Sequence, residues 1–176
     1  AADEDSASGL PDFVRNLFPI VATVTDQGYQ QLDDDEVRER SQRLVDEPEL
    51  NPTAVEEFLR AYSPVTMARV AAEDTMLGDR QVKEGERIML TFPAANRDPE
   101  MFENPEEVII DRQRNRHVAF GSGIHRCAGS NLARMEMNVA IEEFLKMVPT
   151  FELEDPAAVT WAGGQVHGPR KCLVSF

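Results

Sequence analysis

The stretch Phe120-Gly121-Ser122-Gly123-Ile124-His125-Arg126-Cys127-Ala128-Gly129 governs how the rest of the chain is interpreted. Apolar residues after it recur at steps of three and four, which predicts an amphipathic helix that runs to Pro149. Cys127 then lies at the start of a helix, where free backbone N–H groups and the helix dipole favour an anion. Cysteine binds metals as the thiolate, so Cys127 is a candidate metal ligand. The apolar positions of this helix are Ala133, Met137, Ala140, Ile141, Phe144, Leu145 and Val148.

Other residues of the stretch suit a flat macrocyclic cofactor. Gly121, Gly123 and Gly129 leave out side chains where such a ring would approach the backbone, and His125 can donate to a carboxylate at its rim. Each feature alone is weak, because a free cysteine is most often a small buried hydrophobe and a G-x-G turn is common.

The combined pattern F-G-x-G-x-H-x-C-x-G resembles the cysteine-ligand loop of the cytochrome P-450 family, and every defining position is filled. The resemblance implies that Cys127 ligates the iron of haem b. It also implies that the cofactor is bound by the flanking residues Phe120, Gly121, His125 and Gly129.

The bulk composition narrows the choice of partners. The chain has 176 residues with 41% hydrophobic content, and its 32 acidic and 18 basic residues give a net charge of −14. Such a charge argues against nucleic-acid binding and against adhesion to an anionic membrane. No apolar run reaches the length of a membrane span and no signal peptide is evident, so we expect a cytoplasmic protein. Cys172 is expected to be an apolar filler in a reducing compartment.

The N-terminal quarter carries no motif that we can assign. Residues 1–9 are small and acidic and are expected to be mobile, a short apolar patch covers residues 13–21, and charged residues 31–44 predict a solvated helix. We therefore divide the chain into an acidic N-terminal segment, residues 1–45, and a haem-binding region, residues 46–176.

A second helix is predicted after Asn51-Pro52, with Asn51 as its N-cap and Pro64 beyond its end. Glu57 and Arg60 lie three residues apart on it and are therefore neighbours on its surface. A solvent-exposed pair is the ordinary interpretation of this spacing.

The sequence around this pair, Glu-Glu-Phe-Leu-Arg-Ala-Tyr-Ser-Pro, also resembles the E-x-x-R helix of the P-450 family. That resemblance implies a buried ionic network of Glu57 and Arg60, to which Arg112 adds a second arginine. It places Arg69 where members of the family hold a haem propionate, and Ala94–Phe102 is similar to the family's A-N-R-D-P-x-x-F stretch.

Short alternating runs predict strands at residues 75–77, 81–82, 87–90 and 151–153, and closing hairpins over residues 159–176. The expected fold is mainly α with small antiparallel β-sheets, an α+β arrangement. It corresponds to the C-terminal, cysteine-ligand half of the P-450 fold.

Members of that family are much longer, and their oxygen-activating helix, an acid or amide beside a threonine, has no counterpart here. We therefore identify no catalytic residue on the distal side of the haem. We also expect the apolar faces of the helices at residues 55–62 and 133–148 to lack part of their packing.

Three functions stay open. The first is a haem-thiolate monooxygenase, or a truncated form of one, that hydroxylates a small organic substrate. The second is a non-catalytic haem-binding or regulatory fragment, and the third is a non-haem interaction module. Arg112, Arg114, Arg116, Arg126 and Arg134 lie in a stretch without acidic residues. This stretch predicts an acidic electron-transfer partner, ferredoxin- or flavodoxin-like, although a solvated basic face is the simpler interpretation. Another chain that supplies the missing half is a further expected partner.

Overall fold

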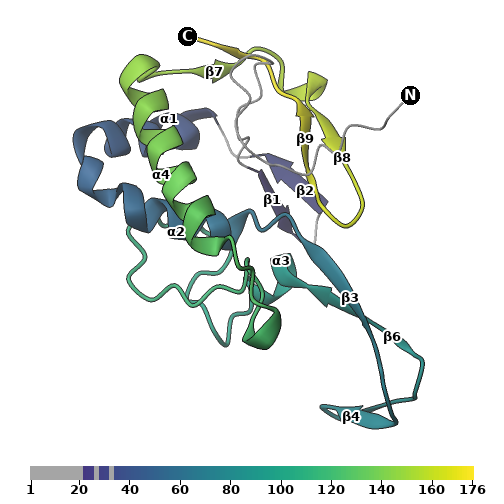
Figure 1. The fold of residues 1–176 in the computed structure, drawn as a ribbon. Helices are drawn as coiled ribbons and strands as arrows, with labels where there is room; N and C mark the ends of the chain where they lie inside the picture. Colours follow the sequence, from purple (N-terminus) through teal and green to yellow (C-terminus); the bar gives the residue numbers. More distant parts are fainter. Residues whose placement is uncertain (1–21, 26–27, 32–33) are drawn as a thin grey trace.

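The computed structural model describes residues 22–25, 28–31 and 34–176 (Figure 1). The predictions for residues 1–9 and for the apolar patch at 13–21 lie outside the described residues. The first elements are an antiparallel hairpin of β1 (Ala22–Thr25) and β2 (Gly28–Gln31).

Three helices form one layer, with the main core between them (Figure 1). They are α1 (Asp34–Asp46), α2 (Asn51–Ala61) and α4 (Ser130–Met147), and a 3₁₀ turn, η1 (Pro48–Leu50), joins the first two. Helix formation here depends on burial of apolar faces, since short helices are marginal alone. The buried apolar residues are Leu44, Ala54, Ala61, Val108, Ile110 and Leu145 in one cluster, and Val55, Leu59 and Ala119 in another.

The prediction that Asn51 caps α2 is wrong. The N-cap position is Leu50, already in helical conformation, because the 3₁₀ turn runs directly into the helix. The buried Asn51 side chain instead donates from Nδ2 to the carbonyl of Asn138 in α4, at 2.9 Å. It ties two helices together, a long-range use that local sequence does not reveal.

The apolar faces of α2 and α4, which were expected to lack part of their packing, differ from that expectation. The α2 face is covered, because Val55 is fully buried and Leu59 nearly so. The predicted face of α4 is buried or half-buried, but Leu132, Met135 and Val139 on another face are each more than half exposed. The uncovered apolar surface therefore lies on a stripe of α4 that the periodicity did not single out.

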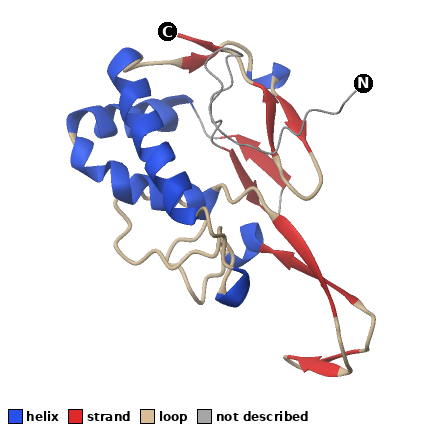
Figure 2. Ribbon diagram, viewed as in Figure 1, coloured by secondary structure: helices blue, strands red, loops and turns tan. Residues whose placement is uncertain are grey.

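The strands form small antiparallel sheets, each of two strands in the described part of the chain (Figure 2). β3 (Thr66–Val70) pairs with β6 (Arg87–Thr91), and this ribbon projects from the helices. β4 (Thr75–Leu77) and β5 (Arg80–Val82) lie at its far end. In the C-terminal part β7 (Glu152–Leu153) pairs with β10 (Val174–Ser175), and β8 (Thr160–Ala162) pairs with β9 (Gly168–Lys171).

These elements confirm the expected mixture of helices and small antiparallel sheets. The remaining elements are a short helix, α3 (Phe92–Ala95), and the 3₁₀ turns η2 (Gly123–His125) and η3 (Pro156–Ala158). No helix in the described ranges combines the length and apolar character needed to cross a membrane.

Candidate functional site

A buried ionic network lies between α2 and residues 96–115, a segment that has no helix or strand. Glu57 and Arg60 are completely buried and form a two-bond pair, with Arg60 Nε donating at 2.9 Å and Nη2 at 2.8 Å. Arg112 Nε donates to the same carboxylate at 2.9 Å, and so does Asn115 Nδ2 at 3.0 Å. The structure thus brings Glu57, Arg60 and Arg112 together.

Arg60 also supplies hydrogen bonds to backbone groups that have no partner in a helix or strand. Its guanidinium donates to the carbonyls of Asn96 (2.9 Å), Pro105 (2.7 Å) and Glu107 (2.7 Å), and it lies over the ring of Phe102. Buried carbonyls need such partners. The network therefore acts as the internal support of a segment that leads directly to the cysteine loop.

The cysteine loop, residues 121–129, is shaped by glycine conformation and is exposed throughout most of its length. Gly121 and Gly123 have φ values of 71° and 65°, a region that strains other residues. The Cys127 N–H donates to the Phe120 carbonyl at 2.9 Å, which closes the loop. Ile124 at its tip is 96% exposed. Gly121 and Gly123 are thus needed for the conformation of the turn. This requirement is separate from the space that a macrocycle would need.

Donor chemistry and exposure on the loop and on β3 fit the thiolate side of a haem. Cys127 is exposed, and a Cβ added at Gly129 would lie 3.8 Å from its sulfur. The His125 side chain is exposed and makes no hydrogen bond within the described ranges. Arg69, half-buried on β3, donates only to the neighbouring Ala68 carbonyl (2.9 Å) among the described residues. A thiol, an imidazole and a guanidinium are thus available to iron and to carboxylates.

The five arginines of the basic stretch at residues 112–134 divide into two groups. Arg112 is bound in the buried network, and Arg134 of α4 forms an ion pair with Glu56. Arg114, Arg116 and Arg126 are exposed and have no ion-pair partner in the described part of the chain. Of the five arginines, these three are thus the free cations in the described part of the chain, so the basic face is smaller than the sequence suggested.

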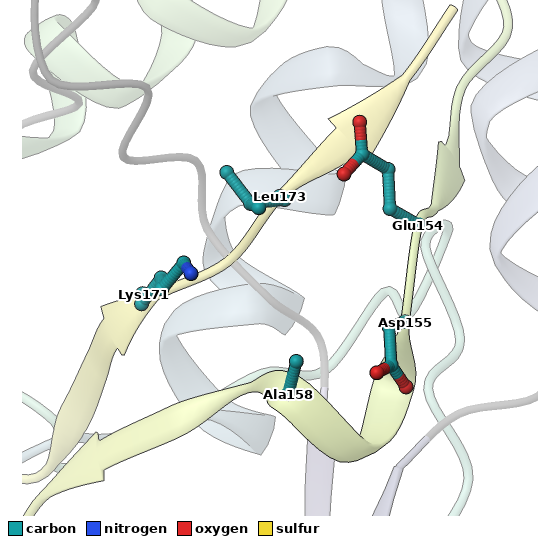
Figure 3. Close-up of a pocket in the computed structure, with 5 residues that line it drawn as sticks. All are labelled: Glu154, Asp155, Ala158, Lys171 and Leu173. Carbon is teal, nitrogen blue, oxygen red and sulfur yellow. The ribbon is translucent and has the colours of Figure 1, made fainter.

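An open cavity of about 550 Å³ lies beside the cysteine loop. Two of the free cations, Arg116 and Arg126, line it, together with Phe120 and the Glu56–Arg134 pair. A second hollow, only about 30 Å³, is lined by Glu154, Asp155, Ala158, Lys171 and Leu173 (Figure 3). It lies near β7 and β9, at the other end of α4 from the cysteine loop, and has room for little more than a water molecule.

Sequence reasoning missed several residues that complete the site. Asn96 is fully buried, donates to Ser63 Oγ at 2.5 Å and accepts the Val118 N–H at 2.7 Å. Asn115 adds the fourth side-chain hydrogen bond to the Glu57 carboxylate. Asn96 lies in the stretch that resembles A-N-R-D-P-x-x-F, but that resemblance alone assigned it no contact. The signal for Asn115 is an asparagine in a segment without regular structure, which is too common to select it.

Comparison with known proteins identifies the family. The family model described as Cytochrome P450 matches residues 32–159. Cytochrome P450-terp of Pseudomonas sp is 41% identical over 131 residues, which cover 74% of this chain and 30% of that protein. The steroid C26-monooxygenase of Mycolicibacterium smegmatis is 40% identical over 141 residues, 79% of this chain and 35% of that protein.

Solved structures agree with these sequence matches. The Bacillus subtilis polyketide-synthase cytochrome P450 PksS superposes with a TM-score of 0.73 at 43% identity, covering 76% of this chain and 35% of its own. P450BioI, solved with an acyl carrier protein ligated to hexadec-9Z-enoic acid, gives 0.74 at 38% identity and covers 78% and 36%. The chain spans about a third of the length of the curated relatives that it matches.

Proposed function

The chain belongs to the cytochrome P450 family, and on that premise we propose that it forms the cysteine-ligand side of a haem-thiolate monooxygenase. The observation that carries this proposal is the exposed Cys127 on a loop fixed by two positive-φ glycines and by the Phe120 carbonyl. A thiolate that is presented rigidly at a surface can ligate a metal without rearrangement. Haem iron, when bound, supplies the oxygen activation of the family.

The cofactor proposed is haem b, held by this chain through three contacts. Cys127 supplies the thiolate, and Arg69 and His125 bind the propionates, since buried carboxylates need charged or hydrogen-bonding partners. Phe120, Gly121 and Gly129 form the nearby wall. The Glu57–Arg60–Arg112 network is proposed to hold the segment that leads to this loop.

The protein partner proposed is an acidic ferredoxin- or flavodoxin-like carrier that binds at Arg114, Arg116 and Arg126. These arginines are exposed and unpaired among the described residues, in a chain with a net charge of −14. Their charge can therefore guide an acidic protein to the cysteine side. The substrate is proposed to be a small organic molecule, as is typical of the family.

A second candidate, a haem-binding fragment without coupled oxygenation, is favoured by the extent of the match. The matched region is about a third of the relatives, and no α-helix among the described residues has an acid or amide directly beside a threonine. Coupled oxygenation needs ordered proton delivery and exclusion of water on the other side of the haem. Product formed per reducing equivalent distinguishes the two candidates, and high coupling by the chain alone would exclude the second.

Absorption spectroscopy tests the central assignment. Reduced, haem-loaded protein under carbon monoxide should show the strongly red-shifted Soret band of thiolate ligation. A Cys127→Ser variant should lose that band. Cys172→Ala is the matched control and should retain it, because Cys172 is only 2% exposed. An unchanged spectrum in Cys127→Ser, or a wild-type spectrum of histidine-ligated haem, would contradict the proposal.

A further inference from the structure

Three side chains from separate parts of the chain meet beside the cysteine loop. Glu56 is on α2, His117 lies just before the loop, and Arg134 is on α4. Arg134 donates to the Glu56 carboxylate through Nε at 2.5 Å and through Nη2 at 3.0 Å. His117 Nε2 lies 2.9 Å from Glu56 Oε2. One carboxylate thus joins two helices to the entrance of the loop.

The hydrogen bonds define the protonation of this group. The Ala119 N–H points to His117 Nδ1 at 3.2 Å, so the imidazole proton lies on Nε2 and is donated to Glu56. Burial lowers the pKa of His117, which keeps the ring neutral near pH 7. Burial alone would raise the pKa of Glu56, but hydrogen bonds from Arg134 and His117 outweigh it and the pKa is lowered.

The same arginine contacts the ring of Phe120, the residue immediately before the cysteine loop. The guanidinium carbon of Arg134 lies 4.8 Å from the centre of the Phe120 ring, in cation–π geometry. The Phe120 carbonyl accepts the Cys127 N–H at 2.9 Å. The contacts therefore form a continuous series from Glu56 through Arg134 and Phe120 to the cysteine backbone.

We infer that Glu56, His117 and Arg134 form a clamp that holds the Phe120 ring and so positions the loop that carries Cys127. A guanidinium can bind a carboxylate with two parallel bonds while its flat face covers an aromatic ring, which lysine cannot do. Glu56 fixes the orientation of the guanidinium, and His117 fixes Glu56. The three are positioning residues. The importance of a fixed Cys127 for haem binding rests on the proposed function, but the existence of the clamp does not.

Hydrogen exchange of the chain without haem tests the clamp directly. The Cys127 amide is protected by its bond to Phe120, so a loosened loop exchanges faster. Glu56→Gln and Arg134→Lys should each speed exchange of residues 118–129 by about fivefold, the scale of one partly exposed charged pair. Amides of residues 138–147 in α4 should keep their wild-type rates. Arg134→Lys keeps the positive charge. Faster exchange of the loop in this variant would therefore show that the planar guanidinium and its contact with the Phe120 ring protect the loop, and not the charge alone.

Glu142→Gln is the matched control, because Glu142 forms an exposed ion pair with Lys146 on the same helix. It should leave exchange of the loop unchanged. The inference is overturned if the loop exchanges at the wild-type rate in both clamp variants, or if exchange rises equally over α2 and α4. Loss of the fold in both variants would also overturn it, since the residues would then serve the whole fold.

Haem loading supplies the second readout. Clamp variants should show a smaller fraction of the red-shifted carbon monoxide band than wild type at equal haem content. If wild type binds no haem, the proposed function fails while the exchange experiment still decides the clamp.

Discussion

Residues 96–115 and the cysteine loop both lack regular secondary structure, yet they obtain their order in different ways. The first segment surrounds Glu57 and Arg60, and its carbonyls accept hydrogen bonds from completely buried side chains. The second is exposed, is closed by short-range backbone hydrogen bonds, and leaves the Cys127 thiol and the His125 ring at the surface. One region is completed by hydrogen bonds from buried side chains, and the other keeps a thiol and an imidazole accessible at the surface.

This comparison predicts opposite behaviour on mutation: changes in the network should destabilise the protein, and changes in the loop should affect binding.

The largest effect is expected at Glu57. Glu57→Gln leaves Arg60 and Arg112 buried without a full counter-charge, so we expect a loss of about 3–5 kcal/mol in the free energy of unfolding. Urea denaturation at neutral pH measures it. Glu84→Gln is the control, because Glu84 and Arg87 have the same E-x-x-R spacing in an exposed hairpin. Equal losses in the two variants would remove the distinction between the regions.

The next effect concerns the groups at the surface of the site. Arg69→Ala and His125→Ala should each weaken haem retention by roughly tenfold or more, the scale of one hydrogen bond to a charged group. Stability of the haem-free chain should not change, since neither side chain has a long-range partner among the described residues. Haem transfer to a scavenger protein gives the rate, with Arg80→Ala as control. Unaltered retention would refute both assignments.

A smaller effect is expected at the free cations. Arg126→Glu should slow electron delivery from an acidic carrier by about tenfold at low salt and flatten its dependence on ionic strength. Arg87→Glu, which makes the same charge change on β6, should have little effect. Rates that respond equally to both variants would indicate a general charge effect without a docking face.

The smallest effect is the pH dependence of the clamp. Because the pKa of folded Glu56 lies below its ordinary value of 4.5, its contribution is present above that pH and is lost as the pH falls through the folded value. Wild type should therefore exceed Glu56→Gln in stability by about 0.5–1 kcal/mol at pH 6, and the difference should diminish below pH 4. Urea denaturation across this range tests it. A constant difference would show that ionisation of Glu56 is not involved.

Regular elements were predictable because their signals are local. The apolar steps in α4 follow from its buried face, and turn residues bound the runs that form β4, β5 and β6. The structure has these elements close to the expected bounds. The role of Asn51 was mispredicted because a local cap competes with a partner on α4, 87 residues away.

Pairs of residues that lie far apart in the sequence leave no local signal in it. Glu56 and Arg134 are 78 residues apart, and the sequence presents Arg134 simply as one more arginine in a basic stretch. Consecutive residues on a helix differ by about 100° in direction. Glu56 and Glu57 therefore face different neighbours, and only the folded chain shows that one serves the buried network and the other the clamp.

Because the chain is synthesised from its N-terminus, the spacing of the Arg60 network also affects the order of folding. The three carbonyls that Arg60 binds follow it by 36, 45 and 47 residues, and Asn115 follows Glu57 by 58. Helix α2 thus leaves the ribosome with both charges in water, long before their partners exist. Desolvation of the pair can be compensated only when these loops close, and contacts of such high contact order form slowly. We therefore expect residues 96–115 to become ordered late and in a concerted step, in which both charges lose their water together.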